Sequence, residues 1–538
     1  MTTTNEELAP IYEMGPTGSS AVESSAESDS AGVRTVHGIK WALAYASLIS
    51  TVLFYSLDGT IVAGIQPSII DSLGEIDKLA WIGVSVTLRA FAVLPMGKAY
   101  GVFNVRLLFL TCVTGFEIGS AICGAAPNMN IMILGRVIQG VTGCGCYSGA
   151  LTYISMITTK HDRPLYLSGV LAMWGLGSVL GPVIGGAFAQ SSATWRWAFY
   201  INLVVAALFA PALIFCLPDI NPVNYFTFIQ KLKAQDWVGT IVFLGSAARL
   251  SMAITFGGVS YAFSSGAEIT LWTMAGVLLV IFILVTIFHP FVSSKNRLYP
   301  IHLMKRMELN ILQYTLFVAA GALLITLYYT PLIFRFTRGD EPLMAGVRLL
   351  PFICLIVVFG FANGALMPRF GYYMPWYVVG NALILVGSSL MITINSSTSA
   401  SRIYGYTSLI GAGIGSYISA AFAVVQALIP VSDVNNAVSF MTIGQMLGQI
   451  TLLSIAGSLY QNIGANKLSN LLPAYTGKEI EQLMMGRDSS LFHTLSLEMQ
   501  RQVVEQVTLA IRNTFAVEIA ASAVGFVGSM FLGRQKLY

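Results

Sequence analysis

The sequence predicts an all-α polytopic membrane protein whose helices cross the bilayer many times. Of its 538 residues, 55% are hydrophobic and only 10% are charged, whereas an ordinary soluble domain has about 25% charged residues. Apolar runs of about 20 residues, the length that crosses a hydrocarbon core, recur from Trp41 to Leu532 with little polar sequence between them. One large helical bundle in lipid is therefore expected.

Matching the apolar runs to helix geometry gives fourteen candidate transmembrane helices. They cover residues 41–65, 79–96, 106–124, 130–155, 164–187, 197–217, 236–258, 269–290, 308–332, 345–366, 375–394, 403–428, 437–460 and 513–533. Residues 1–40 precede the first span, and their acidic, Ser-rich composition predicts a disordered cytoplasmic tail.

Lys and Arg are concentrated in the connections on one side of these spans, which places both termini in the cytoplasm. Asn395, in an N-x-[ST] sequence, then lies in an outer loop as a candidate glycosylation site. The plasma membrane is the expected location, with the vacuolar membrane as an alternative, since no address signal is evident.

A long outer connection, residues 461–512, differs from the other loops. It contains a capping-box pattern from Thr476 to Glu479 and then apolar residues at helical spacing, namely Val503, Val504, Val507, Ala510 and Ile511. Surface helices that cover the outer mouth are expected here. A packed loop without a gating role is the alternative.

Composition also excludes several classes of function. A net charge of +4 from scattered basic residues does not indicate nucleic-acid binding. The six cysteines all fall in predicted spans, so neither a disulfide framework nor a zinc site is expected. The five histidines form no cluster at ligand spacing, so we expect no metal, no cofactor and no enzymatic activity.

Four charged residues in the first four spans are predicted to share one depth. Asp58, Arg89, Glu117 and Arg136 each lie about 10 to 14 Å below the outer surface at 1.5 Å per residue. Charges inside a membrane cost about 2.5 to 3.5 kcal/mol on insertion scales and need a partner or a function. Protonation of either acid would change the partner of a base, which suits proton coupling. A static ion-pair network is the alternative.

Two further patterns concern packing and substrate. Gly177, Gly181, Pro182, Gly185 and Gly186 in the fifth span permit close helix contact and a bend, and packing alone would explain them as well. In the C-terminal half we expect no acid in the middle of the membrane. The spans there contain amide and aromatic side chains, which suit an amphiphilic organic substrate. The candidate substrate contacts are Gln139, Gln445, Gln449, Tyr328, Tyr329 and Tyr417.

Several of these segments resemble motifs of drug:proton antiporters in the major facilitator superfamily. Residues 177–186 (GSVLGPVIGG) resemble the antiporter motif GxxxGPxxGG. Residues 57–62 (LDGTIV) are similar to the first-span signature L-D-x-T-I-V, and residues 134–140 (LGRVIQG) to the fourth-span signature R-x-x-Q-G. Residues 195–202 (WRWAFYIN) are similar to a run typical of the fourteen-span fungal branch. The resemblance extends over about residues 41–533.

This resemblance implies a fold of two six-helix bundles, at 41–217 and 308–533, joined by two extra transmembrane helices at 236–290. It also implies alternating access around a central cavity, with Asp58 and Arg136 in proton coupling. In the cytoplasmic gate motif only Gly97 and Arg106 carry over, because Gly101 replaces the usual Asp and Asn104 the usual Gly.

The expected function is therefore efflux of amphiphilic organic compounds, such as secondary metabolites, toxins or drugs, in exchange for protons. The expected partners are the substrate, protons and the lipid bilayer, and the expected state is a monomer. Uptake symport of a siderophore or other small solute is the main alternative, and a non-transporting sensor is a second one.

Overall fold

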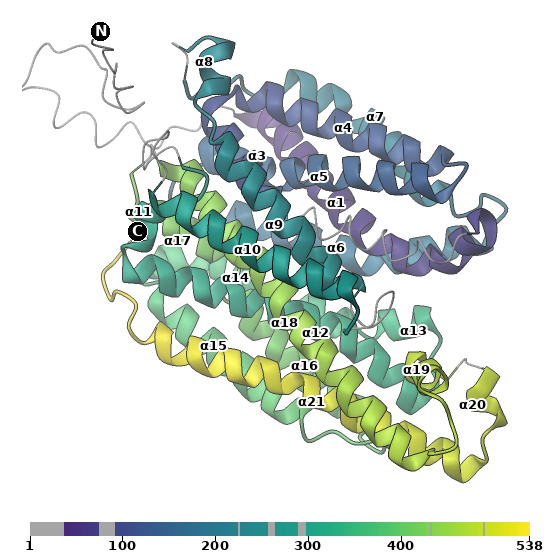
Figure 1. Cartoon of the computed structure of the whole chain (residues 1–538). Coiled ribbons are helices and arrows are strands. Elements are labelled where there is room, and N and C mark those ends of the chain that lie inside the picture. The colour runs from purple at the N-terminus through teal and green to yellow at the C-terminus, as the bar shows by residue number, and fades with distance from the viewer. Residues whose placement is uncertain are drawn as a thin grey trace, which may run out of the picture.

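The computed structural model describes residues 37–74, 92–223, 226–256, 264–288, 297–430, 433–487 and 490–537, and the regular elements in these ranges are helices (Figure 1). The proposed disordered tail lies almost wholly outside the described residues. The expected all-helical fold is thus confirmed for the part of the chain that the structure describes.

The helices form two bundles that lie side by side (Figure 1). The N-terminal bundle consists of α1 (Gly38–Leu73), α3 (Val93–Val102), α4 (Val105–Ala125), α5 (Met129–Ile157), α6 (Arg163–Gln190) and α7 (Trp197–Phe215). The C-terminal bundle consists of α12 (Met307–Arg338), α14 (Leu350–Phe370), α15 (Met374–Met391), α16 (Ala400–Gly415), α17 (Ala420–Leu428), α18 (Val434–Leu471) and α21 (Leu497–Ser529).

Two more helices, α9 (Trp237–Phe256) and α10 (Gly266–Phe288), pack against each other on the outside of the bundles (Figure 1). The remaining helices are short: α8 (Phe228–Lys233), α11 (Ile301–Met304), α13 (Pro342–Val347), α19 (Gly477–Met485) and α20 (Ser490–Thr494). The described chain begins with α1 and ends after α21 at the same end of the molecule (Figure 1). We call this the inner end, and the opposite end the outer end.

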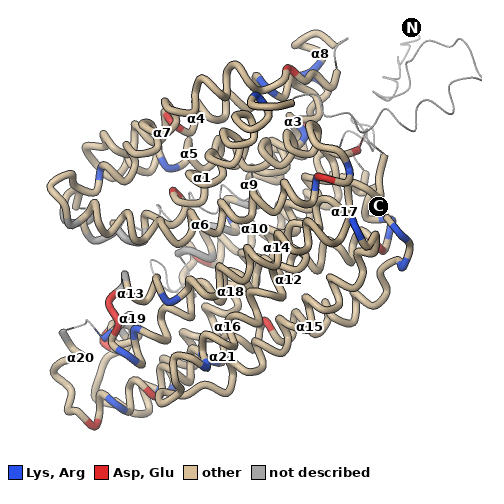
Figure 2. Tube along the Cα trace, turned by 180° about the vertical axis from the view of Figure 1, so that it is seen from behind, with Lys and Arg blue, Asp and Glu red and all other residues tan. Residues whose placement is uncertain are grey.

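Eleven helices in the described ranges are long and apolar enough to cross a membrane. The predicted spans 130–155 and 236–258 lie on α5 and α9, which are helical but outside that set. The predicted span 79–96 lies mostly outside the described residues. Charged residues gather toward the two ends of the bundle, with few between them (Figure 2), as a hydrocarbon layer around the middle requires.

The predicted outer connection 461–512 proves to be mostly helical. α18 continues to Leu471 and α21 already begins at Leu497, with α19 and α20 between them. The expected capping box is present, since the Glu479 carboxylate accepts a hydrogen bond from Thr476 N at 2.7 Å. α19 packs on α18, where Tyr460 Oη donates to the Met484 carbonyl at 2.7 Å. The surface helices are therefore confirmed, and their gating role stays a prediction.

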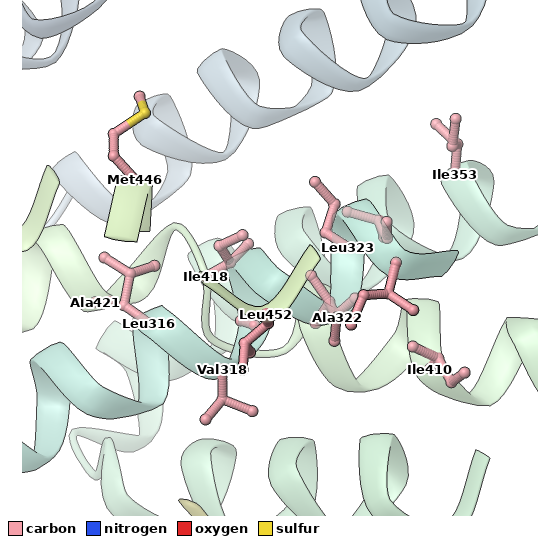
Figure 3. Packing of buried hydrophobic residues seen from close by; sticks show 14 of the residues in the cluster. Leu316, Val318, Ala322, Leu323, Ile353, Ile410, Ile418, Ala421, Met446 and Leu452 are labelled. Atoms are coloured by element: carbon pink, nitrogen blue, oxygen red, sulfur yellow. The ribbon is translucent and has the colours of Figure 1, made fainter. Parts of the chain in front are cut away.

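A continuous apolar core runs through the C-terminal bundle and into its neighbour. Figure 3 shows Leu316, Val318 and Leu323 of α12 beside Leu452 of α18 and Ile410 of α16. The same cluster includes residues of α1, α5 and α6. The two bundles thus share buried apolar packing.

The glycines of the predicted antiporter motif bring α6 against α1. A Cβ on Gly177 would lie 2.5 Å from the Leu53 carbonyl oxygen, and one on Gly181 would lie 2.9 Å from the Leu57 carbonyl oxygen. A Cβ on Gly185 would lie 2.6 Å from the Ile61 carbonyl oxygen, whereas Gly186 has no atom within 4 Å. Three of the four glycines therefore permit backbone contact, and α6 stays helical through Pro182.

The neighbouring glycines Gly185 and Gly186 provide a matched test of this contact. Gly185→Ala should lower the thermal stability of the purified protein by about 1 to 3 kcal/mol, because the new methyl group collides with the α1 backbone. Gly186→Ala should leave the unfolding temperature unchanged. Equal unfolding temperatures for the two variants would contradict the proposed backbone contact.

Candidate functional site

A buried ion pair joins α1 to α5. The Arg136 side chain is 1% exposed and that of Asp58 is fully buried. Arg136 Nη1 donates to both Asp58 carboxylate oxygens, at 2.8 and 2.9 Å, and to Gln139 Oε1 at 2.9 Å. Gln139 Nε2 in turn donates to Asp58 Oδ1 at 3.0 Å and to Ser120 Oγ of α4 at 2.7 Å. This cluster thus joins three helices, α1, α4 and α5.

This arrangement leaves Arg136 with unused hydrogen-bonding capacity. Its Nε and Nη2 atoms are buried without a hydrogen-bond partner among the described residues, and its guanidinium carbon lies 5.8 Å from the centre of the Phe199 ring. A proton on Asp58 would remove the charge that fixes Nη1, while Gln139 Oε1 would still accept its hydrogen bond. The cluster can therefore change its hydrogen bonding with one proton.

The predicted layer of four charges is only partly visible. Arg89 lies outside the described residues. Glu117 of α4 lines a separate cavity of about 20 Å³, together with Tyr55, Cys146 and Asn202, and this volume is close to that of one water molecule. Its Oε2 atom is buried without a hydrogen-bond partner among the described residues. The part of Glu117 and Arg89 in proton coupling stays a prediction.

A cavity of about 250 Å³ lies between the two bundles. Its walls come from α1, α5 and α6 on one side and from α12 and α18 on the other. Tyr147 Oη of α5 donates to Gln445 Oε1 of α18 at 3.1 Å, which links the bundles at the cavity wall. The lining mixes apolar and aromatic side chains with a few hydrogen-bonding groups, as a site for an amphiphilic molecule requires.

The predicted substrate residues divide into two groups. Gln445, Gln449 and Tyr328 line this cavity. Gln139 does not line it, because its amide is fully buried in the Asp58–Arg136 cluster. Tyr329 packs edge-on against the ring of Tyr460, and Tyr417 donates to Asn381 Oδ1 at 3.1 Å, and neither tyrosine lines the cavity. These three residues therefore lie outside this cavity, because helix rotation decides which side chains face it, and their role as substrate contacts stays a prediction.

Sequence reasoning missed the aromatic residues on the opposite wall, Tyr55, Tyr147 and Trp174. Tyr55 and Tyr147 stack with their ring centres 5.4 Å apart. Aromatic residues are frequent in apolar helices, and no local pattern distinguishes those that face a cavity from those that pack in the core. Only the assembled bundle identifies them.

At the inner end, α3 contacts the beginning of α18. A Cβ on Gly97 would collide with the Ser439 side chain, and Lys98 Nζ donates to Asn436 Oδ1 at 2.7 Å. A Cβ on Gly101 would lie 3.4 Å from Asn435 Nδ2. The position where the family usually has an Asp therefore faces an amide, and Lys98 supplies the polar link to the other bundle.

The other residue of the predicted gate, Arg106, makes its contact within its own bundle. Its guanidinium donates to the Ile214 carbonyl near the C-terminus of α7, where a helix dipole favours a cation. In the C-terminal bundle, Asp433 Oδ2 lies 3.4 Å from His302 Nε2, and this contact lowers the pKa of the Asp433 carboxyl. An acidic group of the C-terminal bundle thus lies at the inner end near Lys98.

Asn395 lies in the exposed turn between α15 and α16 at the outer end. Its Oδ1 atom accepts hydrogen bonds from Ser397 N at 3.1 Å and from Ser397 Oγ at 2.8 Å. The side chain is accessible but engaged in a tight local turn, and its glycosylation stays a prediction.

Comparison with known proteins identifies the family. The family model of the Major Facilitator Superfamily matches residues 48–453. The chain belongs to the Major Facilitator Superfamily. It is therefore a multi-pass membrane transporter and not an enzyme.

The curated relatives of this transporter include fungal efflux pumps. It is 46% identical over 527 residues to the protein named "Efflux pump DEP3" of Fusarium langsethiae, covering 98% of this chain and 95% of that protein. It is 47% identical over 504 residues to the protein of the same name from Alternaria brassicicola, covering 94% of this chain and 89% of that protein. "Efflux pump patC" of Aspergillus clavatus is 38% identical over 504 residues, with 93% and 92% coverage.

Solved structures support the same fold. The human organic anion transporter MFSD10 matches with a TM-score of 0.56 at 12% identity, covering 90% of this transporter and all of that chain. The proton:xylose symporter XylE also matches with a TM-score of 0.56 at 12% identity, covering 92% of this transporter and 96% of that chain. At this identity the likeness concerns the fold alone.

A second buried carboxylate lies in the C-terminal bundle of the transporter. Glu518 of α21 is fully buried, and its carboxylate accepts from Thr326 Oγ1 of α12 at 3.2 Å and from Ser388 Oγ of α15 at 2.6 Å. The expectation that these spans lack a mid-membrane acid was wrong. The signal was present in the sequence, since Glu518 is a single acid inside the predicted span 513–533.

Glu518 is expected to stabilise the contact of α21 with α12 and α15. Glu518→Leu should lower the free energy of unfolding by about 1 to 3 kcal/mol, because two buried hydroxyl groups lose their partner. Glu518→Gln should stay close to the wild type, since an amide can bond to both hydroxyls. Thermal unfolding of the two purified variants in detergent would measure the difference, and equal losses would contradict the hydrogen-bonding role.

Proposed function

We propose that this transporter exports amphiphilic organic compounds, such as fungal secondary metabolites or toxins, in exchange for protons. The observation that carries the proposal is the position of the Asp58–Arg136–Gln139 cluster beside the cavity. Ser56, Gly59 and Thr60 line the cavity on α1, within one turn of Asp58. The names of the fungal relatives, which are efflux pumps, support the outward direction.

The cluster provides a means of coupling. With Asp58 ionised, Arg136 holds α5 against α1 through two hydrogen bonds to the carboxylate. With Asp58 protonated, this attraction weakens, and the α1 segment that lines the cavity is released from α5. A proton gradient would then favour one arrangement on one side of the membrane and the other arrangement on the opposite side.

The cavity indicates the class of substrate. The rings of Tyr55, Tyr147 and Trp174 provide apolar surface, while Gln445, Gln449 and Ser454 provide a small number of hydrogen-bonding groups. This combination suits a molecule with a large apolar part and a few polar atoms. We further propose that the transporter works as a monomer in the plasma membrane, with the inner end in the cytoplasm and no cofactor.

Transport in proteoliposomes tests the proposal directly. The transporter would be reconstituted, a pH gradient imposed, and lipophilic organic compounds screened while proton and substrate fluxes are recorded together. Opposite movement of protons and substrate would support efflux by antiport. Movement in the same direction would make the transporter an uptake symporter and overturn the proposed direction.

Asp58→Asn is expected to abolish gradient-driven transport, because the uncharged amide cannot exchange a proton. Exchange of labelled for unlabelled substrate without a gradient should continue, since the side chain keeps its size and Gln139 can still bond to it. Ser47→Ala is the control, because Ser47 is buried in the same helix and, in the described ranges, its hydroxyl donates to the Ala44 carbonyl of that helix. Normal gradient-driven efflux by Asp58→Asn would remove this residue from the coupling mechanism.

Gln449→Leu should weaken substrate binding by about two- to twelvefold, the effect of losing one hydrogen bond worth about 0.5 to 1.5 kcal/mol. Tyr417→Phe is the matched control, because Tyr417 bonds to Asn381 and does not line the cavity. Titration of a fluorescent substrate into purified transporter measures both affinities. A larger loss for Tyr417→Phe than for Gln449→Leu would show that this cavity is not the binding site.

A further inference from the structure

Another cavity, of about 550 Å³, lies at the inner end of the N-terminal bundle. It is formed between α3 and α4 of the N-terminal bundle and the segment that contains α8 and the start of α9. Apolar residues dominate its wall, among them Leu107, Leu108, Phe226, Leu232 and Trp237. None of its lining residues lines the cavity between the bundles.

Exposed apolar side chains surround this cavity. Phe228 and Ile229 of α8 are 66% and 65% exposed, and Val238 and Ile241 on the first turns of α9 are exposed as well. In a membrane protein such apolar surface lies against acyl chains. α8 is a short helix with a capping box at Thr227 and two basic residues, Lys231 and Lys233. This combination is typical of a segment at the boundary between headgroups and acyl chains.

Lys231 gives the cavity a positive charge. The residue is 7% exposed and lines the cavity. In the described ranges its ammonium group donates to a neutral partner, Asn221 Oδ1, at 2.7 Å. The acidic residues nearby in the sequence are engaged elsewhere: Asp219 accepts from Asn104, and Asp236 accepts from the backbone of Gly239 and Leu298. A buried ammonium group whose partner is a neutral amide keeps its charge uncompensated, so binding of an anion beside it is favourable.

We propose that this cavity binds an anionic glycerophospholipid of the inner leaflet. The phosphate lies beside Lys231, and one acyl chain lies along the apolar wall toward Leu107 and Leu108. Charge complementarity selects an anionic headgroup, and the apolar wall selects a lipid over free phosphate. The bound lipid would join the α8–α9 segment to α3, the helix that contacts α18 at the inner end. The inference requires only a membrane protein and does not depend on the direction of transport.

Lipid retention by the intact transporter tests the site. The purified full chain would be exchanged into detergent that contains either phosphatidylserine or phosphatidylcholine with identical acyl chains, and bound lipid would be counted by native mass spectrometry. Lys231→Gln removes the charge. Lys233→Gln is the control on the same helix, because Lys233 is exposed and does not line the cavity. Thr111→Phe fills the cavity from α4 without altering Lys231.

The wild type should retain phosphatidylserine in preference to phosphatidylcholine. Lys231→Gln should reduce the retained phosphatidylserine about fivefold, since one basic residue contributes about 1 kcal/mol to binding an anionic lipid. Thr111→Phe should reduce retention of both lipids, and Lys233→Gln should match the wild type. Unfolding temperatures would establish that each variant is folded. If Lys231→Gln does not fold, Thr111→Phe still tests the site independently.

Three results would overturn the proposal. Equal retention of the two lipids by the wild type would exclude selection by charge. Unchanged phosphatidylserine retention in both Lys231→Gln and Thr111→Phe would place the lipid elsewhere. Displacement of the bound phosphatidylserine by inorganic phosphate or by a transported amphiphile, each added alone, would assign the cavity to a free anion or to lateral substrate entry.

Discussion

Charges inside a membrane need partners, and this constraint governs the arrangement of the N-terminal bundle. Asp58 and Arg136 are almost fully buried and neutralise each other across α1 and α5. Gln139 and Ser120 extend the same network to α4. The network fixes the rotation of three helices about their axes, because each helix must direct one particular side chain to the same point. The other faces of these helices are then free to pack against neighbouring helices or to line a cavity.

α1 illustrates how those faces are used. One side bears Leu53, Leu57 and Ile61, whose backbone meets the glycines of α6. A second side directs Asp58 to Arg136, and a third presents Ser56, Gly59 and Thr60 to the cavity. Helix packing, charge pairing and cavity lining therefore meet within about two turns of one helix. The cavity wall lies within one helical turn of Asp58, so a change in the charge of Asp58 can move the residues that line the cavity. The proposed coupling rests on this proximity.

The two bundles satisfy their buried carboxylates differently. Asp58 has a cationic partner, whereas Glu518 has the hydroxyl groups of Thr326 and Ser388. The contact between bundles at the inner end also departs from the family pattern. Gly101 faces Asn435, and the polar link runs from Lys98 to Asn436. The inner-end contact thus rests on a lysine and an amide, with Asp433 nearby, in place of the usual motif. The proposed lipid site also lies at the inner end, on a different face of the same helix, α3.

The sequence alone determined the class of fold and the family. Hydrophobic length is a local property, and so are the glycine spacing of residues 177–186 and the presence of Asp58 and Arg136, so each could be read without a structure. Equal depth even predicted that Asp58 and Arg136 could meet. Helix continuity was less predictable: α18 and α21 extend well into the polar region 461–512, because neighbouring helices support them there.

Only the tertiary structure decided which polar and aromatic side chains share a site. Gln139 and Gln445 are both amides in apolar helices, yet one completes the ion pair and the other lines the cavity. Tyr328 and Tyr329 are adjacent in the chain, yet only Tyr328 lines the cavity. These choices depend on the rotation and crossing of helices that are far apart in the sequence. That geometry is set by contacts such as α1 with α6, and no local pattern specifies it.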